Sequence, residues 1–563
     1  MRKHVSTQHS RLHPAASGVK QKLASQATCN LECAERIACG FVTAQVLSSY
    51  EAFLFPGSEN KKGQENRTLD SWKGLLYNDA TYYRKEKSLL TYKAWQGLYL
   101  SRVRKRMMNR KTYEMDMVNG PILFKMIAFA VPLMLSSILQ LLFNAADVVV
   151  VGKFAGDNAL AAVGSNGSLI NLLTNFFIGL SIGSNVIVSN YFGAKKEKEA
   201  EEAVHTSMFV SLLSGVLLTI LGLVAAPQIL KLMNVPENIL PLSVLYIRIY
   251  FGGITASMIY NFGSAILRAV GDTRRPLYYL SAAGVLNVIL NLIFVIVFDM
   301  SVAGVALATV ISQCLSAFLI VRCLMREKGM VHLDLAKIKL HPDKFLQILQ
   351  IGIPASLQGI VFSLSNVIIQ ASVNSFGEIV VAGNSAASNI EGFVYVAMNA
   401  FYQSNLSFTS QNMGAGRYDR ITRILITAQA CVIVTGLVLG NLAVYFGPQL
   451  LSIYTDSAAV IQAGLNRLDV IARWYFLCGI MDVMVGSMRG MGHSVEPMVT
   501  SLLGACGLRL LFIFTIFGWP EFHTIHALYM TYPISWIVTF LGHIACFFVI
   551  RSKVFRKVGY WRS

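Results

Sequence analysis

The chain has 563 residues, of which 54% are hydrophobic and only 14% charged. Soluble domains contain about 25% charged residues, so this composition excludes an ordinary soluble protein and indicates a membrane protein. The net charge of +18 does not indicate nucleic-acid binding, because residues 1–116 hold 20 Lys and Arg against 10 Asp and Glu. The remaining excess lies in loops between apolar segments.

Residues 1–116 contain no apolar run long enough to cross a membrane and no hydrophobic core of a secretory signal. We expect them to be a disordered or non-native basic extension. Three of the nine cysteines lie in this region, at Cys29, Cys33 and Cys39, without zinc-like spacing. The other six lie in or beside apolar runs, so we predict no disulfide framework, no metal site and no cofactor.

From Ile122 onward, apolar segments of about 20 residues or more recur, each long enough to span a bilayer. We predict an all-α polytopic membrane protein with twelve transmembrane helices, at residues 122–151, 160–190, 203–226, 240–267, 276–298, 302–325, 348–374, 380–410, 421–446, 466–489, 496–518 and 526–550. The loops on one side hold 21 Lys and Arg, and those on the other hold Lys153, Lys231 and Arg467. The positive-inside rule then places both termini in the cytoplasm, and we expect the plasma membrane as the location.

The chain also resembles itself at an offset of 221 to 222 residues. The Ala-Val-Pro that ends at Pro132 matches the Gly-Ile-Pro that ends at Pro354, and Gly193-Ala matches Gly414-Ala. Because six helices return the chain to its starting side, the halves share one orientation and form two pseudo-symmetric lobes around a central cavity. That arrangement suits alternating access. The expected division is 1–116 for the extension, 117–330 for the N-lobe, 331–345 for a cytoplasmic linker, 346–551 for the C-lobe and 552–563 for a basic cytoplasmic tail.

One acidic residue, Asp147, lies inside the first predicted helix, fifteen residues after Pro132. A charge in hydrocarbon is expensive, and no base of the same helix lies near enough to neutralise it, so we predict a functional site at Asp147. Pro132 removes an intrahelical hydrogen bond and favours a bend. Polar neighbours that could complete a proton relay or a Na+ site are Asn144, Asn287, Asn291 and Thr309. The alternative for these residues is hydrogen bonding between helices.

The C-terminal half holds a different set of ionisable residues: Glu391, Asp482 and Arg509. Arg509 lies near the middle of its predicted helix and must find an acid or water, so we expect it to pair with Glu391 or Asp482. The alternative is a role in substrate binding or ion coupling. Side chains that could line an adaptable apolar cavity are Tyr260, Phe262, Met398, Phe401 and Tyr402, although such residues in membrane helices more often serve packing.

Several of these segments carry a family resemblance that covers about residues 117 to 558. Phe143-Asn-Ala-Ala-Asp147-Val-Val-Val-Val-Gly resembles the first-helix signature of the multidrug and toxic compound extrusion (MATE) transporters. Ser189-Asn-Tyr-Phe-Gly-Ala, Gln411-Asn-Met-Gly-Ala-Gly and Tyr260-Asn-Phe-Gly-Ser-Ala-Ile-Leu-Arg-Ala-Val-Gly-Asp-Thr resemble further family segments. The resemblance implies two six-helix lobes, V-shaped, that export amphipathic compounds against entering Na+ or H+.

The resemblance also assigns roles to residues. Asp147 occupies the position of a coupling carboxylate, a Pro at Pro132 is associated with bending of the helix, and Asn287 and Thr309 match other polar positions of that site. Two departures matter: many members carry a second acid where this chain has Asn291, which favours H+ over Na+, and the acid of the seventh helix is missing near Val361 to Ser365.

Other functions are less consistent with the sequence. The chain lacks the short motifs of membrane-embedded hydrolases and lacks a P-loop, so we expect neither an enzyme nor an ATP-driven pump. A flippase for a lipid-linked substrate would share the two-lobe plan but would need several cationic residues in its cavity. The expected partners are small amphipathic, cationic substrates and membrane lipids, with no nucleic acid, and we expect a monomer.

Overall fold

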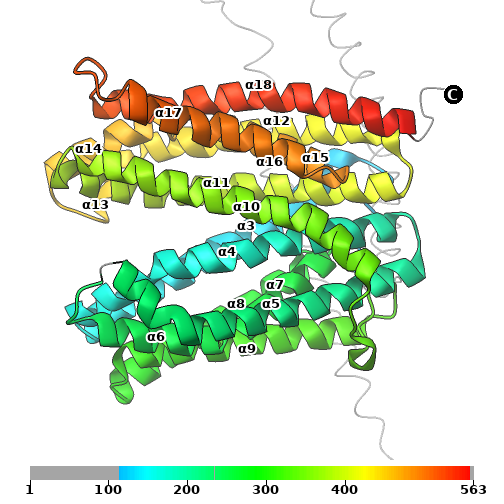
Figure 1. Cartoon of the computed structure of the whole chain (residues 1–563), viewed down its shortest axis with the longest axis horizontal. Helices are drawn as coiled ribbons and strands as arrows, with labels where there is room; N and C mark the ends of the chain where they lie inside the picture. The colour runs from blue at the N-terminus through cyan, green and yellow to red at the C-terminus, as the bar shows by residue number, and fades with distance from the viewer. Residues whose placement is uncertain (1–112, 234, 558–563) are drawn as a thin grey trace, which may run out of the picture. The chain divides into compact units, whose positions relative to one another are not determined.

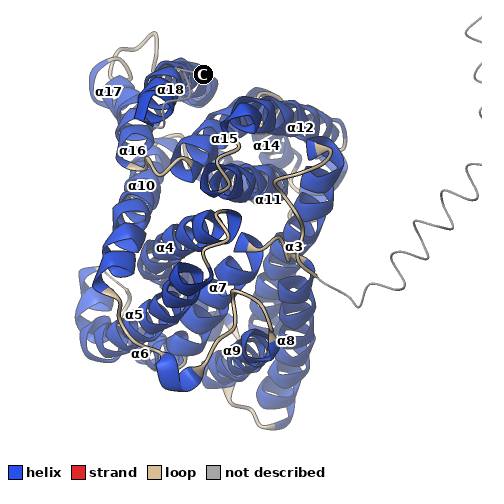
Figure 2. Ribbon diagram, turned by 90° about the vertical axis from the view of Figure 1, so that its right-hand side faces the viewer, coloured by secondary structure: helices blue, strands red, loops and turns tan. Residues whose placement is uncertain are grey.

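The computed structural model describes residues 113–233 and 235–557, and these form helices joined by loops, with no strand among them (Figures 1 and 2). The expected extension at residues 1–116 lies almost entirely outside the described residues. The helices of the first half are α3 (Ile122–Phe154), α4 (Asp157–Gly193), α5 (Glu197–Leu232), α6 (Leu240–Gly252), α7 (Ile254–Ala269), α8 (Arg274–Leu292), which continues as a π-helical turn η1 (Ile293–Val297), and α9 (Ser301–Arg326).

A short 3-10 turn, η2 (Leu335–Lys337), lies in the loop between the halves. The helices of the second half are α10 (Pro342–Asn374), α11 (Glu378–Gly414), α12 (Tyr418–Tyr445), α13 (Gly447–Ser452), α14 (Ala458–Val470), α15 (Phe476–Gly490), α16 (Val495–Ser501), the π-helical η3 (Leu502–Gly507), α17 (Leu508–Thr515) and α18 (Ile525–Lys557). In Figure 1, α11 to α18 form the upper bundle and α4 to α9 the lower one.

The number of spans is close to the twelve predicted. Nine helices within residues 113–233 and 235–557 are long and apolar enough to cross a membrane, and the pair α6 and α7, bent by 46°, makes a tenth. The remaining two predicted spans correspond to α11, which buries many polar residues, and to α14 with α15. The spans 240–267 and 466–489 were expected to be single helices, which is wrong: the first breaks at Gly253 and the second at the turns of residues 471–475.

The repeat predicted from the sequence is visible in the backbone. The helices α3 and α10 both have 33 residues, and α4 and α11 both have 37 and begin 221 positions apart. A glycine with positive φ precedes both members of the second pair, Gly156 at 83° and Gly377 at 89°. A second equivalent pair, Gly271 at 92° and Gly492 at 88°, ends the turns after α7 and α15. Equal lengths and equal turns show that the two halves fold in the same way.

The two lobes meet along α4, which packs against both α10 and α11 of the second half. A Cβ atom on Gly193 would lie 2.1 Å from the carbonyl oxygen of Gln411, and one on Gly414 would lie 1.9 Å from that of Asn190. Gly193 and Gly414 are 221 positions apart, as are Asn190 and Gln411, so the contact is reciprocal. The absence of side chains at both glycines allows the backbones to touch. The amide of Gln411 strengthens this junction by donating to the carbonyl oxygen of Ala269, at 2.7 Å.

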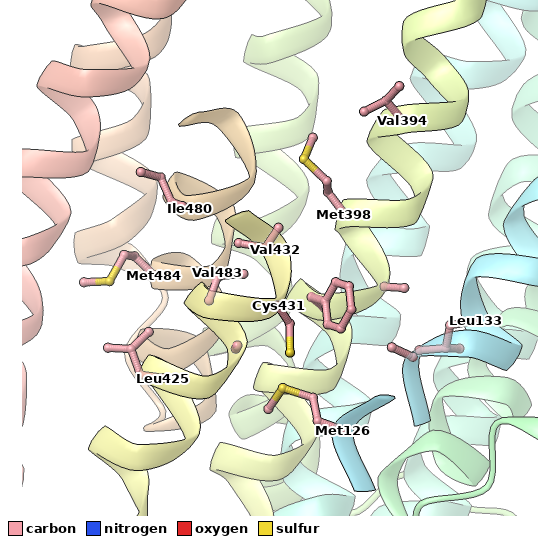
Figure 3. Packing of buried hydrophobic residues seen from close by; sticks show 14 of the residues in the cluster. Met126, Leu133, Val394, Met398, Leu425, Cys431, Val432, Ile480, Val483 and Met484 are labelled. Carbon is pink, nitrogen blue, oxygen red and sulfur yellow. The ribbon is translucent and has the colours of Figure 1, made fainter. Parts of the chain in front are cut away.

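The first helix is shared between the lobes. The first half of α3 contributes Met126, Phe129 and Leu133 to the apolar core of the C-lobe, where they pack with Met398 and Cys431 among others (Figure 3). The second half of α3 packs against α8 instead. Pro132, which is buried, stands between these two environments. A change of bend at this residue would therefore move one part of α3 relative to a part that is fixed in the other lobe.

The segment that precedes α3 also joins the two lobes, at the end of the helices that carries the Lys- and Arg-rich loops. The backbone N–H of Met115 donates to Val270 in the N-lobe, at 3.1 Å. The carbonyl oxygen of Met117 accepts from the amide of Asn412, at 3.1 Å, and that of Gly120 accepts from Arg420, at 3.0 Å. We name residues 113–121 the strap.

Candidate functional site

Three helices of the N-lobe bring the predicted polar residues together. Asp147 lies on α3, Asn287 and Asn291 lie on α8, and Thr309 lies on α9. The two asparagines are four positions apart, so they share one face of α8. Both are buried, with 6% and 0% of their surface exposed. The fold therefore brings an acid, two amides and a hydroxyl together between α3, α8 and α9.

Hydrogen bonds connect these residues into a chain. The amide nitrogen of Asn291 donates to the Asp147 carboxylate, and it also lies 3.4 Å from the Oδ1 atom of Asn287. The amide nitrogen of Asn287 donates to the Thr309 hydroxyl at 3.4 Å, and that hydroxyl donates to the carbonyl oxygen of Val305 at 3.0 Å. Asn291 is the donor in both of its contacts, so one branch ends on the Asp147 carboxylate and the other runs through Asn287 and Thr309 to the carbonyl oxygen of Val305.

The electrostatic consequence concerns Asp147. Neutral amide donors stabilise its charge without cancelling it, and no base within residues 113–233 and 235–557 forms an ion pair with it. The Oδ1 atom of Asn291 is buried and accepts no hydrogen bond. The carboxylate can therefore gain or lose a proton or a small cation without first breaking a salt bridge.

Two other residues predicted for this site have different positions. The side chain of Asn144 is exposed and makes no hydrogen bond in the described structure, although it lies one turn from Asp147. Pro132 lies inside α3, which continues through it as one helix. The carbonyl oxygen of Pro132 accepts from the hydroxyl of Ser136, at 2.8 Å.

The acid Glu391 of the C-lobe has a partner that the sequence analysis missed. It forms a bidentate ion pair with Arg467 of α14. Nε of Arg467 donates to Oε1 of Glu391 at 3.0 Å, and Nη2 donates to Oε2 at 2.8 Å. The third guanidinium nitrogen donates to Asn384, at 2.7 Å, and both charged side chains are less than 10% exposed. The assignment of Arg467 to a loop is therefore wrong, because this arginine lies inside α14 and forms an ion pair with a buried acid.

The expected pairing of Arg509 with Glu391 or Asp482 is also wrong. Arg509 donates to the hydroxyl of Ser535, at 2.8 Å, and lies over the ring of Tyr532, at 4.1 Å from its centroid. Aromatic rings and one hydroxyl hold this guanidinium, since its Nη2 atom has no hydrogen-bond partner. Such cation–π contacts are strong when they are shielded from water. Asp482 makes neither a hydrogen bond nor an ion pair with any residue that the structure describes.

The side chains expected to line a cavity lie mostly in packed cores. Phe262 is fully buried in a small N-lobe cluster, and Met398 and Phe401 belong to the C-lobe core. Tyr260 donates from its hydroxyl to the carbonyl oxygen of Pro276, at 3.1 Å. Tyr402 accepts from a guanidinium nitrogen of Arg489, at 2.8 Å. The structure thus gives these residues packing and hydrogen-bonding roles.

Arg489, the last residue of the predicted span 466–489, is a further buried charge. A second of its nitrogens donates to Gln358, at 2.8 Å, so this arginine connects α15 with α10 and α11. Its equivalent in the first half is Arg268, 221 positions earlier. The repeat itself was the signal, because both arginines lie at the same place at the end of a transmembrane helix.

Comparison with known proteins is consistent with this architecture. The sequence model of the MatE family matches residues 132–293 and 354–515, one match in each lobe. The probable multidrug resistance protein YpnP of Bacillus subtilis is 30% identical over 406 residues, which cover 72% of this chain and 90% of that protein. The probable multidrug resistance protein YoeA of the same organism is 28% identical over 421 residues, covering 73% of this chain and 90% of YoeA.

A solved structure has the same fold. An outward-facing multidrug resistance transporter of the MATE family superposes with a TM-score of 0.71 at 20% identity, and the match covers 79% of this chain and 99% of that one. The two matches to the MatE sequence model begin 222 positions apart, which is the offset of the internal repeat.

Proposed function

The chain belongs to the MATE family of efflux transporters, and we propose that it is a secondary active exporter in which a cation entering at Asp147 drives small amphipathic, cationic compounds outward. The names of YpnP and YoeA support multidrug substrates. Its membrane-spanning helices make it a multi-pass membrane protein, and the basic loops support the plasma membrane with both termini in the cytoplasm.

The observation that carries the proposal is the acid without a counter-charge. Asp147 is partly buried between helices and accepts from the amide of Asn291, and no described base forms an ion pair with it. Binding of a proton removes the charge and turns one carboxylate oxygen from an acceptor into a donor. The hydrogen bond from the amide of Asn291 then loses its charge assistance and weakens, and the packing of α3 against α8 changes.

Pro132 gives this local change a path to the other lobe. The part of α3 before Pro132 packs in the C-lobe core, and the part after it carries Asp147. A loosened contact with α8 allows the second part to bend, which changes the shape between the lobes. A cation can drive this change only through its different affinity for the two shapes.

We propose that the coupling ion is H+. Asn291 presents an N–H group to the carboxylate, whereas a Na+ site needs several oxygens that converge on the ion. Only one carboxylate takes part in the network of Asp147, Asn287, Asn291 and Thr309, so one proton neutralises it completely.

The test is efflux of a fluorescent cationic dye from vesicles that contain the purified protein, under a proton gradient or a sodium gradient imposed separately. Proton-driven efflux that is lost in Asp147→Asn, but kept in Asp456→Asn of an exposed loop, would support the proposal. Sodium-driven efflux would contradict the choice of ion. Full activity of Asp147→Asn would remove Asp147 from the mechanism.

A further inference from the structure

An aromatic ring lies directly on the backbone of α8, next to the coupling site. A Cβ atom at Gly284 would lie 1.8 Å from Cε2 of Phe143 and 2.2 Å from its Cδ2 and Cζ atoms. Ordinary van der Waals contact begins at about 3.4 Å. The ring therefore occupies the space that any side chain at Gly284 would need, and this sets how closely α3 and α8 approach.

This contact lies on the same faces as the hydrogen bond to Asp147. Phe143 precedes Asp147 by four positions on α3, and Gly284 precedes Asn287 by three and Asn291 by seven on α8. Residues at these spacings stack along one helix face. Side chains in a helix lean toward its N-terminus, so Phe143 reaches back to Gly284 while Asp147 meets Asn291 further along.

We propose that Phe143 and Gly284 are positioning residues: the ring seated on the bare glycine holds α3 and α8 at the separation at which Asn291 can donate to Asp147. This inference rests on the proposed function of Asp147. Neither residue touches the cation. Both act by fixing the distance between the amide of Asn291 on α8 and the carboxylate of Asp147 on α3.

The geometry explains why a small change here should have a large effect. A hydrogen bond weakens steeply once donor and acceptor separate beyond their normal range. The Phe143 ring has few alternatives in a helix, because only two χ1 rotamers are available to it there. A methyl group at Gly284 must therefore displace either the ring or the whole of α3, and the second outcome separates Asn291 from Asp147.

The first experiment is Gly284→Ala in the vesicle assay. We expect proton-driven efflux per folded molecule to fall about tenfold, the effect of losing one hydrogen bond to a charged group. Dye binding by the purified protein should stay unchanged if the substitution acts only on the contact between α3 and α8. Adding Phe143→Val to the Gly284→Ala chain removes Cδ2, Cε2 and Cζ, the ring atoms that overlap the methyl group, and should restore most of the rate.

A matched control comes from the same lobe. A Cβ atom at Gly222 of α5 would lie 2.2 Å from Cγ of Phe251, a similar overlap of glycine and ring that does not involve α3. Gly222→Ala should reduce the yield of folded protein while leaving the efflux rate per folded molecule unchanged. If Gly284→Ala does not fold, Phe143→Ala removes the ring instead and should lower the rate in the same way.

A double-mutant cycle separates positioning from simple packing. If Gly284 acts through the contact between Asn291 and Asp147, Gly284→Ala should have no further effect once Asn291→Ala has removed the donor. An equal loss in both backgrounds would overturn the inference, as would wild-type efflux in Gly284→Ala. Full efflux in Asp147→Asn would instead overturn the proposed function, so the two failures are distinguishable.

Discussion

The two lobes share one fold but hold the acids Asp147 and Glu391 in opposite ways. In the N-lobe, Asp147 is bound by a neutral amide and forms no ion pair with a described residue. In the C-lobe, Glu391 is clamped by Arg467 through two hydrogen bonds, and Asn384 holds the same guanidinium. A charge locked in an ion pair serves stability, whereas a charge held by neutral donors can still exchange its proton. Of these two acids only Asp147 is free to exchange its proton; Asp482 of the C-lobe also lacks an ion pair among the described residues, but no amide donates to its carboxylate.

The largest effect is expected at Asp147, the acid that has no ion pair among the described residues. Asp147→Asn should abolish proton-driven efflux, because an amide cannot take up the proton. The same change should leave the unfolding temperature nearly unaffected, since no ion pair is broken. Efflux and thermal unfolding measured on one preparation would check both. A large loss of stability would show that Asp147 is structural, like Glu391.

The ion pair of Glu391 and Arg467 should show the reverse: its loss should lower stability. Arg467→Met leaves the Glu391 carboxylate buried without a partner, which should destabilise the protein by about 3–5 kcal/mol. Replacing both residues, Arg467→Met with Glu391→Leu, should recover most of the loss, because no charge is then stranded. Equilibrium unfolding in detergent measures the difference. Equal stability of wild type and Arg467→Met would contradict the role assigned to the pair.

A smaller effect is expected at Arg509, which aromatic rings hold in place of an acid. Arg509→Met loses the hydrogen bond to Ser535 and the contact with Tyr532, but it also removes a buried charge without a counter-ion. These effects oppose each other, so the change in unfolding free energy should stay within about 1 kcal/mol. A loss as large as that of Arg467→Met would mean that Arg509 is also part of an ionic lock.

Much of this architecture follows from local patterns. Apolar length predicts the helices, the repeat predicts equal lobes, and the rarity of acids in hydrocarbon singles out Asp147 together with its neighbours on α8 and α9. The partner of Glu391 did not follow, because Arg467 is 76 positions away and lies in a segment polar enough to read as a loop. Helix periodicity says which side chains share a face, but not which two helices face each other.

The strap offers a weaker test, because it joins the two lobes by a few hydrogen bonds. Arg420→Ala removes the bond to the carbonyl oxygen of Gly120 and should lower the unfolding free energy by about 0.5–1.5 kcal/mol. Arg423→Ala is the control, since this exposed arginine lies on the same helix and its side chain makes no hydrogen bond or ion pair in the described structure. Equal effects of both changes would mean that the bond to the strap contributes nothing measurable.

The smallest effect concerns the N-lobe end of the strap, at Glu114. Burial, together with the nearby carboxylate of Glu327, raises the pKa of Glu114 above its ordinary value of 4.5. The folded protein then holds this proton more tightly than the unfolded chain, so the contribution of Glu114 to stability decreases as the pH rises through its folded pKa. Glu114→Gln should therefore reduce the loss of unfolding temperature between pH 5 and neutral pH. If Glu114→Gln leaves the pH dependence of the unfolding temperature unchanged, the loss of unfolding temperature comes from other acids. Asp147→Asn measured over the same pH range would show whether Asp147 is one of them.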